Sequence, residues 1–528
     1  MLIRPIRRFI AALVFGIIAA VLGTLHHRSI TSKPSTASHM TRSSSAAPVI
    51  VVGSGLAGLS AAHAALEAGA SVRMLDRAPK PGGNSIKASS GINGAGTRFQ
   101  RAAGVREDAS FYDDTARSGG RRFAEAAGAG AGVVDRQRLV GLLTSSSADA
   151  VAWLADGVGV DLSVVAPLGG HSLPRTHRGA GATPPGAAIV AALLERLREN
   201  PGFRLSSSAE VVSLDVSDDG TAVRGVRYVQ DGREHDLAAG AVVFAAGGFA
   251  GDADGLLARY RPDLAGLPST NEARPAPHGI LEAVGAAFVD MDSVQVHPTG
   301  FVDPEDPGAR YKFLAAEVLR GEGGILLSGG GGGGGRFVDE MGTREHVSGA
   351  IMQQRQQQLP PPGEIDGAVR QWDVTLLMDP GACAAAAGHV GFYLWKGLMQ
   401  KKKVKELSPE TVRAVDEYAA AVASGADPAF GRRTFGRWSL AAGDANREEE
   451  VCVGRVTPIT HFTMGGAAFN DRAQVLRGDG TPVDGLWAAG EITGGVHGDN
   501  RLGGSSLLEC VVYGRIAGRE AAKAATAS

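Results

Sequence analysis

The fold is indicated by one stretch, Val49-Ile50-Val51-Val52-Gly53-Ser54-Gly55-Leu56-Ala57-Gly58. Its four apolar residues predict a buried parallel strand, and a GxGxxG turn follows at once. The Ala-rich run Leu59–Ala68 predicts a helix that Gly69 ends, and Ser71–Leu75 predicts the next strand, which stops at Asp76. The sequence therefore predicts the strand–turn–helix–strand unit of an α/β, doubly wound dinucleotide-binding fold.

The glycine turn also predicts a cofactor, although a tight β–α turn without a ligand is the alternative. Glycines let a pyrophosphate lie against the backbone at a helix N-terminus, and Asp76 is placed to accept the ribose hydroxyls. A second loop rich in Gly, Ser and Asn follows at 77–94, and two later strands, 241–248 and 485–491, also end in glycine turns. Three glycine-terminated strands at one crevice favour FAD over a single nicotinamide site. The predicted cofactor contacts are Gly53, Ser54, Gly55, Leu56, Ala57, Gly58, Asp76, Asn84, Ser85, Ser90, Gly91, Glu491, Ser506 and Leu507.

Composition narrows the functional classes. A chain of 528 residues predicts two or three domains, and its net charge of −2 gives no reason to expect nucleic acid as a partner. The three cysteines, Cys383, Cys452 and Cys510, stand far apart and show no haem-attachment or iron–sulfur spacing. Redox chemistry would therefore use an organic cofactor. We expect neither a metal site nor a disulfide framework.

The N-terminus indicates a targeting segment. Arg4, Arg7 and Arg8 precede an uncharged run at 9–25, which is at the short limit for a membrane-spanning helix. The first interpretation is a signal anchor or signal peptide that leads to the secretory pathway (endoplasmic reticulum), with a membrane tether through 9–25. Because no acidic residue occurs before Glu67, a mitochondrial presequence is the second interpretation.

We predict five segments along the chain. Residues 1–28 are the hydrophobic targeting segment, and 29–47 are a Ser/Thr-rich linker. A Rossmann-like FAD-binding domain begins at 48–300 and resumes at 457–528. An α+β capping domain at 301–456 interrupts it.

Several blocks, in chain order, resemble a known family. They are GSGLAGLSAA (53–62), GGNSIKASSGINGAG (82–96), VQVHPTGF (294–301), FLAAEVLRGEGGILL (313–327), TREHVSGAI (343–351), HFTMGG (461–466) and AAGEITGGVHGDNRLGGSSLLEC (488–510). These blocks look like the single-chain soluble fumarate reductases of eukaryotic microbes, in the flavoprotein superfamily of succinate dehydrogenase. The resemblance implies FAD and the reduction of fumarate to succinate by hydride transfer with arginine-mediated protonation. In membrane-bound relatives a histidine carries FAD covalently. No histidine lies between Arg77 and Thr97, and Asn84 stands near that place, so the resemblance implies non-covalent FAD.

The resemblance also implies roles for the polar residues. His297, His461 and Arg501 would hold the substrate carboxylates, and Gly504 would allow a close approach. Arg501 suits this role because its guanidinium can grip a carboxylate at two points. Arg344 would donate the proton, while Glu317 and Arg320, three apart on one expected helix face, would resupply it and contact the substrate site. Free reduced flavin or a separate reductase would supply electrons. The alternatives are another unsaturated acid as substrate, or a flavin-binding protein without turnover.

Three features depart from the family pattern. Ala316 replaces a threonine of a haem-containing relative, and the turn Ala276-Pro277-His278-Gly279 replaces Thr-Gly-Asp-Gly. A run of glycines at 329–335 lies between Glu317 and Arg344, where it could loosen the closing domain. The sequence therefore does not decide what replaces the substrate contact of that threonine or the cofactor contact of that turn.

Overall fold

The computed structural model describes residues 47–125, 132–181, 183–329, 334–354, 356–358 and 369–527. The predicted targeting segment, nearly all of the linker and the possible tether at 9–25 lie outside the described residues, as does most of the glycine run at 329–335. None of the described helices is both long and apolar enough to cross a membrane.

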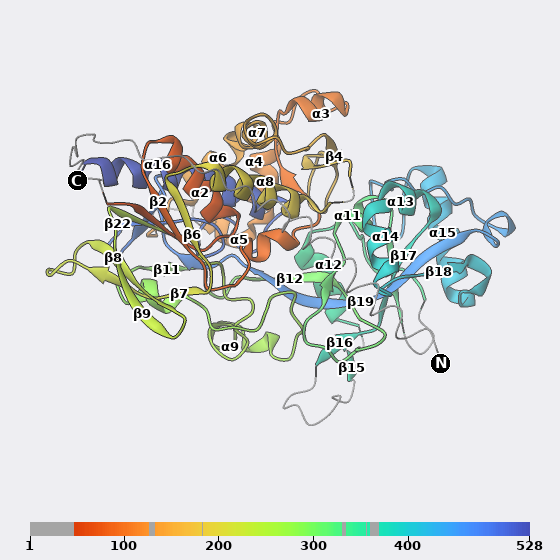
Figure 1. Cartoon of the computed structure of the whole chain (residues 1–528). Helices are drawn as coiled ribbons and strands as arrows, with labels where there is room; N and C mark the ends of the chain where they lie inside the picture. Colours follow the sequence, from red (N-terminus) through yellow and green to blue (C-terminus); the bar gives the residue numbers. More distant parts are fainter. Residues whose placement is uncertain are drawn as a thin grey trace, which may run out of the picture. The chain divides into compact units, whose positions relative to one another are not determined.

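The first sheet has six strands in the order β21-β22-β10-β1-β2-β6 (Figure 1). The strands from β22 to β6 are parallel, and β21 runs antiparallel to β22. The bounds are β1 (Val49–Val52), β2 (Val72–Leu75), β6 (Phe203–Ser206), β10 (Ala241–Phe244), β21 (Gln474–Leu476) and β22 (Pro482–Ala488). The strand predicted at Val49–Val52 is confirmed with its bounds, and those predicted near 71, 241 and 485 are confirmed with shifted ends.

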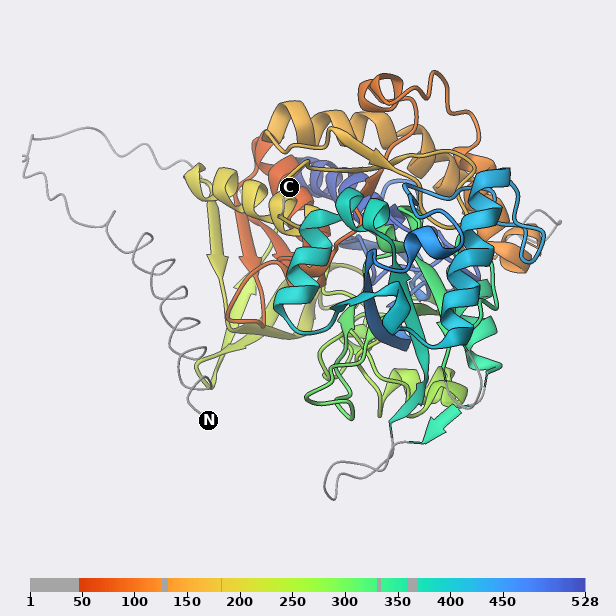
Figure 2. The same cartoon turned by 90° about the vertical axis from the view of Figure 1, so that its right-hand side faces the viewer.

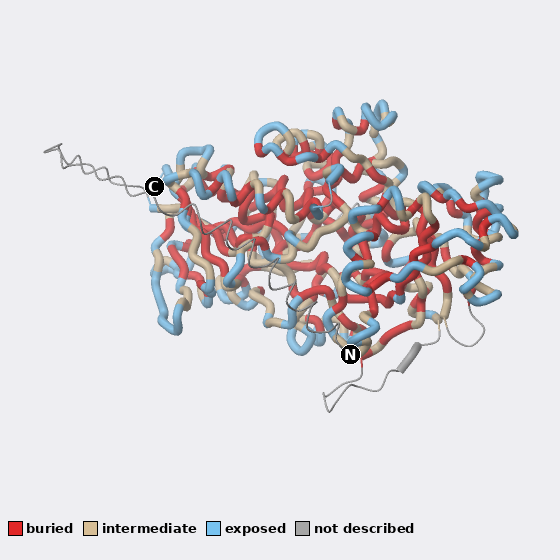
Figure 3. The backbone as a smooth tube through the Cα atoms, turned by 45° about the vertical axis from the view of Figure 1, so that its right-hand side comes forward, coloured by how far each residue is buried: buried red, intermediate tan, exposed pale blue. Residues whose placement is uncertain are grey.

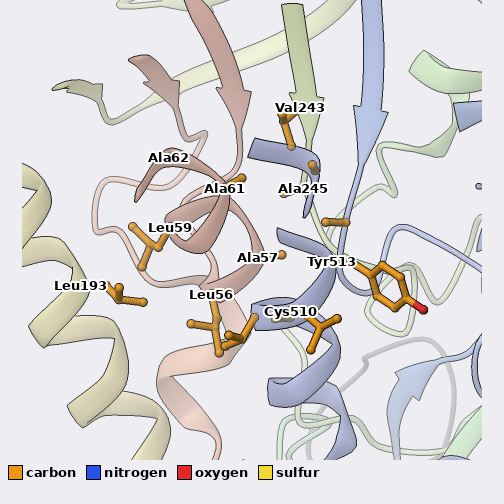
Figure 4. Packing of buried hydrophobic residues seen from close by; sticks show 14 of the residues in the cluster. Leu56, Ala57, Leu59, Ala61, Ala62, Leu193, Val243, Ala245, Cys510 and Tyr513 are labelled. Atoms are coloured by element: carbon orange, nitrogen blue, oxygen red, sulfur yellow. The ribbon is translucent and has the colours of Figure 1, made fainter. Parts of the chain in front are cut away.

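Both faces of this sheet are covered, which explains its continuous apolar strands. Val49 and Val51 pack in one core with the helices α2 (Leu56–Glu67), α8 (Pro185–Glu199) and α16 (Ser505–Ala527). Figure 4 shows members of this core, among them Leu56, Leu193, Val243 and Tyr513. Successive strand residues alternate between faces, so Ile50 and Val52 join a second core. That core includes residues of the antiparallel sheet β7 (Ala209–Val216), β8 (Val223–Gln230) and β9 (Arg233–Ala238).

A second six-stranded sheet lies in the middle of the sequence. Its path is β13-β12-β19-β17-β14, with β18 also paired to β19, and all of its pairings are antiparallel. The bounds are β12 (Val294–Phe301), β13 (Phe313–Leu314), β14 (Ile325–Ser328), β17 (Val374–Met378), β18 (Gln400–Lys403) and β19 (Glu450–Thr463). Figures 1 and 2 show the helices that accompany it, coloured green to blue. They are α11 (Val318–Gly321), α12 (Arg344–Met352), α13 (Pro380–Ala385), α14 (Ala387–Trp395) and α15 (Pro409–Ser424).

Two long strands of the second sheet carry residues of interest for function. β12 holds Gln295 and His297, and β19 runs from the second sheet's core to His461. The predicted domain boundaries at 300/301 and 456/457 fall inside these two strands. The division into domains stays a prediction.

The remaining elements lie between these strands and helices along the chain. Figure 3 shows buried stretches on the inside and exposed stretches around them. Among the first 260 residues they are η1 (Gly83–Lys87), β3 (Ile92–Asn93), α3 (Arg98–Ala102), α4 (Phe111–Ser118), α5 (Gly120–Glu125), α6 (Arg136–Ser145), α7 (Ser147–Ala152), η2 (Trp153–Val158), β4 (Val164–Ala166), β5 (Thr176–Arg178) and α9 (Leu256–Tyr260). Further along they are η3 (Pro262–Leu264), α10 (His278–Glu282), β11 (Phe288–Val289), β15 (Gln356–Gln358), β16 (Arg370–Trp372), η4 (Val404–Glu406), η5 (Asp444–Asn446) and β20 (Gly466–Ala467).

Candidate active site

The turn after β1 and the first turn of α2 each have one position that admits only glycine. Gly53 has φ +99°, and a Cβ there would lie 2.4 Å from the carbonyl oxygen of Ala245. A Cβ on Gly58 would lie 2.0 Å from the carbonyl oxygen of Gly53. The turn is therefore as tight as the motif predicts, and it brings the N-terminus of α2 close to the end of β10.

Side chains from two neighbouring segments fix this turn. Asp76, at the end of β2, accepts hydrogen bonds from the backbone N–H of Ser54 at 2.7 Å and from the Ser54 hydroxyl. Its other carboxylate oxygen accepts from the backbone N–H of Ala78 at 2.7 Å. The hydroxyl of Ser85 accepts from the backbone N–H of Leu56 at 3.0 Å. The carboxylate of Asp76 thus holds the turn itself and still lines the cavity described next.

A cavity of about 600 Å³ extends from this turn. Its lining includes every predicted cofactor residue except Gly58, together with Arg344, His461, Arg501 and Gly504. Gly55, the N-cap of α2, makes no side-chain cap, so the first amides of a twelve-residue helix face a site that suits an anion. The volume is within the range of cofactor sites. The residues present therefore fit a long dinucleotide. One end of it would lie at the glycine turn and the other near Arg344, His461 and Arg501.

Unpartnered polar atoms indicate that the cavity takes a polar ligand. Among the described residues, the hydroxyl oxygen of Ser89, Nδ1 of His461 and Nε of Arg501 are buried without a hydrogen-bond partner, and all three residues line the cavity. Buried polar atoms in folded proteins are nearly always satisfied, so a bound molecule would supply their partners.

Arg344 and Glu317 form a buried ion pair at this end of the cavity. Nε and Nη2 of Arg344, the first residue of α12, lie 2.7 and 2.6 Å from one carboxylate oxygen of Glu317. The other oxygen accepts from the backbone N–H of Gly169 at 2.9 Å. Burial would raise the pKa of Glu317, but the charges of Arg344 and Arg320 outweigh it and lower that pKa to about 2. Glu317 is therefore a fixed, ionised partner of Arg344, and it lies behind the cavity lining.

Gln295, which the sequence analysis missed, joins the two cationic residues. Its side-chain oxygen accepts from Nη1 of Arg344 at 2.8 Å and from Nη2 of Arg501 at 3.0 Å. Its amide nitrogen donates to the backbone oxygen of Arg501 at 2.7 Å. Gln295 lies two residues before His297 on β12, and residues at that spacing share a strand face. This spacing from His297 was the feature of the sequence that could have identified Gln295 as a site residue.

Arg501 is buried, and no carboxylate of the described residues is hydrogen-bonded to it. Besides Gln295, it donates to the backbone oxygen of Leu502 at 3.1 Å and lies over the ring of Phe462, 4.2 Å from the centroid. Burial and the charge of Arg344 lower the pKa of Arg501 to about 9. It therefore remains charged at neutral pH, and two guanidiniums face one cavity. Such a place favours an anion.

The two predicted histidines lie one behind the other. The rings of His297 and His461 pack edge to face with centroids 5.3 Å apart, but only His461 lines the cavity. Burial, with the charge of Arg344, holds the pKa of each well below 6.5. Both rings are therefore neutral at pH 7. His461 can donate or accept a hydrogen bond at the cavity, and His297 supports it.

The relay expected from Glu317 and Arg320 stays a prediction. Glu317 is the N-cap of α11, a helix of four residues, and its backbone oxygen accepts from the backbone N–H of Arg320 at 3.0 Å. Nη1 of Arg320 donates to the backbone oxygen of Glu340 at 2.5 Å. Its Nε and Nη2 have no partner within the described parts of the chain. The charge of Arg320 helps to lower the pKa of Glu317.

His171 is a second residue that the sequence analysis did not identify. Its Nδ1 accepts from Arg175 at 2.9 Å, which leaves its Nε2 to donate to the backbone oxygen of Gly503 at 3.0 Å. A Cβ on Gly503 would lie 2.7 Å from a carboxylate oxygen of Glu317. His171 therefore fixes the loop that packs against the ion pair. Its position in a Gly-Gly-His turn was the only sequence signal.

The departing turn at 276–279 forms part of the cavity wall. Ala276, Pro277 and Gly279 line the cavity, while His278 is buried against Phe249 with ring centroids 5.3 Å apart. Burial lowers the pKa of His278 to about 4. The ring is neutral and belongs to the apolar packing behind the wall.

Glu491 provides a pH-dependent test of this site. Burial raises its pKa from 4.5 to about 7, although Thr463 donates to it from its backbone N–H at 3.0 Å. A raised folded-state pKa contributes stability that is present below pH 4.5 and is lost as the pH rises through 7. In the flavin-free protein we expect Glu491→Gln to increase the free energy of unfolding by up to about 3 kcal/mol at pH 8 and to change it little at pH 5. Urea unfolding at both pH values measures this, and an equal change at both would contradict it.

Comparisons with known proteins agree with this geometry. A model of the FAD binding domain family matches residues 48–507. The chain is 40% identical over 490 residues to fumarate reductase 1 of Saccharomyces cerevisiae, covering 90% of this chain and 98% of that protein. It is 38% identical over 490 residues to the fumarate reductase of Schizosaccharomyces pombe, covering 89% and 88%. The open conformation of a flavocytochrome c3 fumarate reductase superimposes with a TM-score of 0.67 at 33% identity, covering 91% of this chain and 79% of that one.

Proposed function

Because this chain belongs to the fumarate reductase family of FAD-binding flavoproteins, we propose that it reduces fumarate to succinate at the end of the cavity lined by Arg344, His461 and Arg501. Its cofactor is FAD, which supplies the hydride when it is bound and reduced. The observation that carries the proposal is the pair of buried guanidiniums that share the oxygen of Gln295 and face one cavity.

Substrate binding follows from charge and hydrogen bonding. Fumarate is a flat dianion, and its carboxylates would offset the repulsion between Arg344 and Arg501. The unpartnered Nε of Arg501 and Nδ1 of His461 would each donate a hydrogen bond to a carboxylate oxygen of the substrate. Both groups are buried, so these charge-assisted bonds are strong and hold the diacid in one orientation.

Protonation is assigned to Arg344. A guanidinium normally keeps its proton, but a carbanion beside a carboxylate is basic enough to take it. Glu317 holds Nε and Nη2 of Arg344 and so fixes the direction of the remaining nitrogen. As an ionised carboxylate, Glu317 also stabilises the guanidinium when the proton is replaced. The positive charge of Arg320 keeps Glu317 in this ionised form.

Three finer points are part of the proposal. FAD is bound without a covalent link, since no histidine lies between Arg77 and Thr97. Electrons come from free reduced flavin or a separate reductase. The uncharged run at 9–25 directs the chain to the secretory pathway or tethers it to a membrane there, with mitochondria as the alternative. Imaging a fusion with a free N-terminus decides between the two compartments.

An anaerobic flavin experiment tests the function. The yellow protein is reduced with a stoichiometric amount of dithionite and then mixed with fumarate. We expect the oxidised flavin spectrum to return rapidly with formation of succinate, and acid precipitation to leave the flavin in the supernatant. If urocanate but not fumarate restores the spectrum, the substrate is another unsaturated acid. If neither does, the protein binds flavin without turnover.

A further inference from the structure

Two of the three cysteines lie together in the second sheet's core, although 68 residues separate them in the sequence. Cys452 on β19 pairs with Met378 in the antiparallel ladder with β17. Cys383 on α13 points back to that position, with its sulfur 3.6 Å from the backbone oxygen of Met378. Both cysteines belong to one packed cluster. The two sulfurs are thus neighbours around the end of β17.

Their surroundings differ in a way that suits disulfide exchange. Cys383 is half-buried and Cys452 is buried. The neighbouring Cys452 raises the pKa of Cys383, and the neighbouring Cys383 lowers the pKa of Cys452. Lys401, opposite Cys452 in the ladder with β18, lowers the pKa of Cys452 further through its charge. Cys452 is therefore the sulfur that more readily becomes a thiolate.

We propose that Cys383 and Cys452 are a modification site at which an intrachain disulfide forms by exchange with a small disulfide such as glutathione disulfide. Cys383, the more exposed sulfur, passes its proton to the Cys452 thiolate and attacks one sulfur of glutathione disulfide, releasing one glutathione thiolate. Cys452 then gives that proton to the released glutathione thiolate, attacks the Cys383 sulfur and displaces the second glutathione. In total two protein thiols are oxidised to one disulfide, and one glutathione disulfide is reduced to two glutathione molecules.

The bond would join α13 to the central strand of the second sheet. It closes a loop that contains α14, β18 and α15. α13 also packs behind the segment that follows α11, where a Cβ on Gly323 would lie 3.5 Å from the Cβ of Ala382. The disulfide would therefore restrict the movement of α13, which packs behind Glu317 and Arg320, and it would not contact the cavity itself.

Thiol counting on the full chain tests the proposal. The protein is equilibrated with reduced or oxidised glutathione, then denatured, alkylated with iodoacetamide and weighed by mass spectrometry. We expect all three cysteines to be alkylated in the reduced sample and only Cys510 in the oxidised one. Cys510 lies apart in the core around α16 and serves as an internal control. Cys510→Ser should remove that last alkylation, and Cys383→Ser should leave Cys452 and Cys510 both alkylated.

A melting measurement gives an independent readout. Oxidation should raise the Tm of the unchanged chain by roughly 5 °C and leave that of Cys383→Ser unchanged. Alkylation of all three cysteines after treatment with oxidised glutathione would overturn the proposal. So would a glutathione that stays attached to Cys383, because it would mean that Cys452 cannot reach the Cys383 sulfur.

Discussion

Replacing Arg344 with alanine is expected to lower kcat for fumarate reduction by roughly 10³-fold while the flavin stays bound. The change removes the group assigned to protonate the substrate carbon and one of the two guanidiniums that face the cavity. The flavin remains because the glycine turn, Asp76 and Ser85 are untouched. Steady-state turnover with an artificial reductant and the visible spectrum of the purified protein measure the two effects.

The same change leaves the carboxylate of Glu317 buried without its partner, which by itself destabilises a protein by about 3–5 kcal/mol. The double variant Arg344→Ala with Glu317→Gln removes that charge, so we expect it to regain Tm but not activity. This pair of variants separates chemistry from folding. If turnover returned together with Tm, Arg344 would have no part in the protonation.

The cofactor side of the site was predictable from the sequence because its motif consists of residues that are close together in the chain. A four-residue strand, three glycines at fixed spacing and an acid at the end of the next strand specify one turn, and the turn at Gly53 and Gly58 is as tight as the motif requires. The strand at Val49–Val52 was predicted with its bounds for the same reason. Each of these features depends on neighbours within about thirty residues.

The substrate side was only partly predictable because it is assembled from distant segments. Arg344, Glu317 and Arg501 come from three separate parts of the chain, and Gln295 on β12 lies between the two arginines only in the folded chain. The relay expected from Glu317 and Arg320 depends on α11, a helix of only four residues, and it stays a prediction.

Gln295→Leu is the second change from which we expect a large effect. The substitution keeps a similar volume in the buried position but removes the oxygen that accepts from both Arg344 and Arg501. Two buried guanidinium N–H groups would lose their partner, and the two positive charges would lose the dipole between them. We expect kcat/KM for fumarate to fall by about 10²-fold and the free energy of unfolding to fall by about 2 kcal/mol.

Gln371→Leu is the matched control, since Gln371 is also fully buried on a strand but does not line the cavity. Its amide nitrogen donates to the backbone oxygen of Pro307 at 2.7 Å, and its own oxygen has no partner among the described residues. This variant should lose less stability, because it breaks one hydrogen bond and removes an unpartnered oxygen, and it should keep kcat/KM for fumarate. Both variants exchange a buried amide for the same apolar side chain. The comparison therefore tests whether the effect on activity depends on the position of Gln295 between the two arginines. Equal losses of activity in the two variants would show that Gln295 matters for folding alone, and the two arginines would then need no common acceptor to hold the diacid.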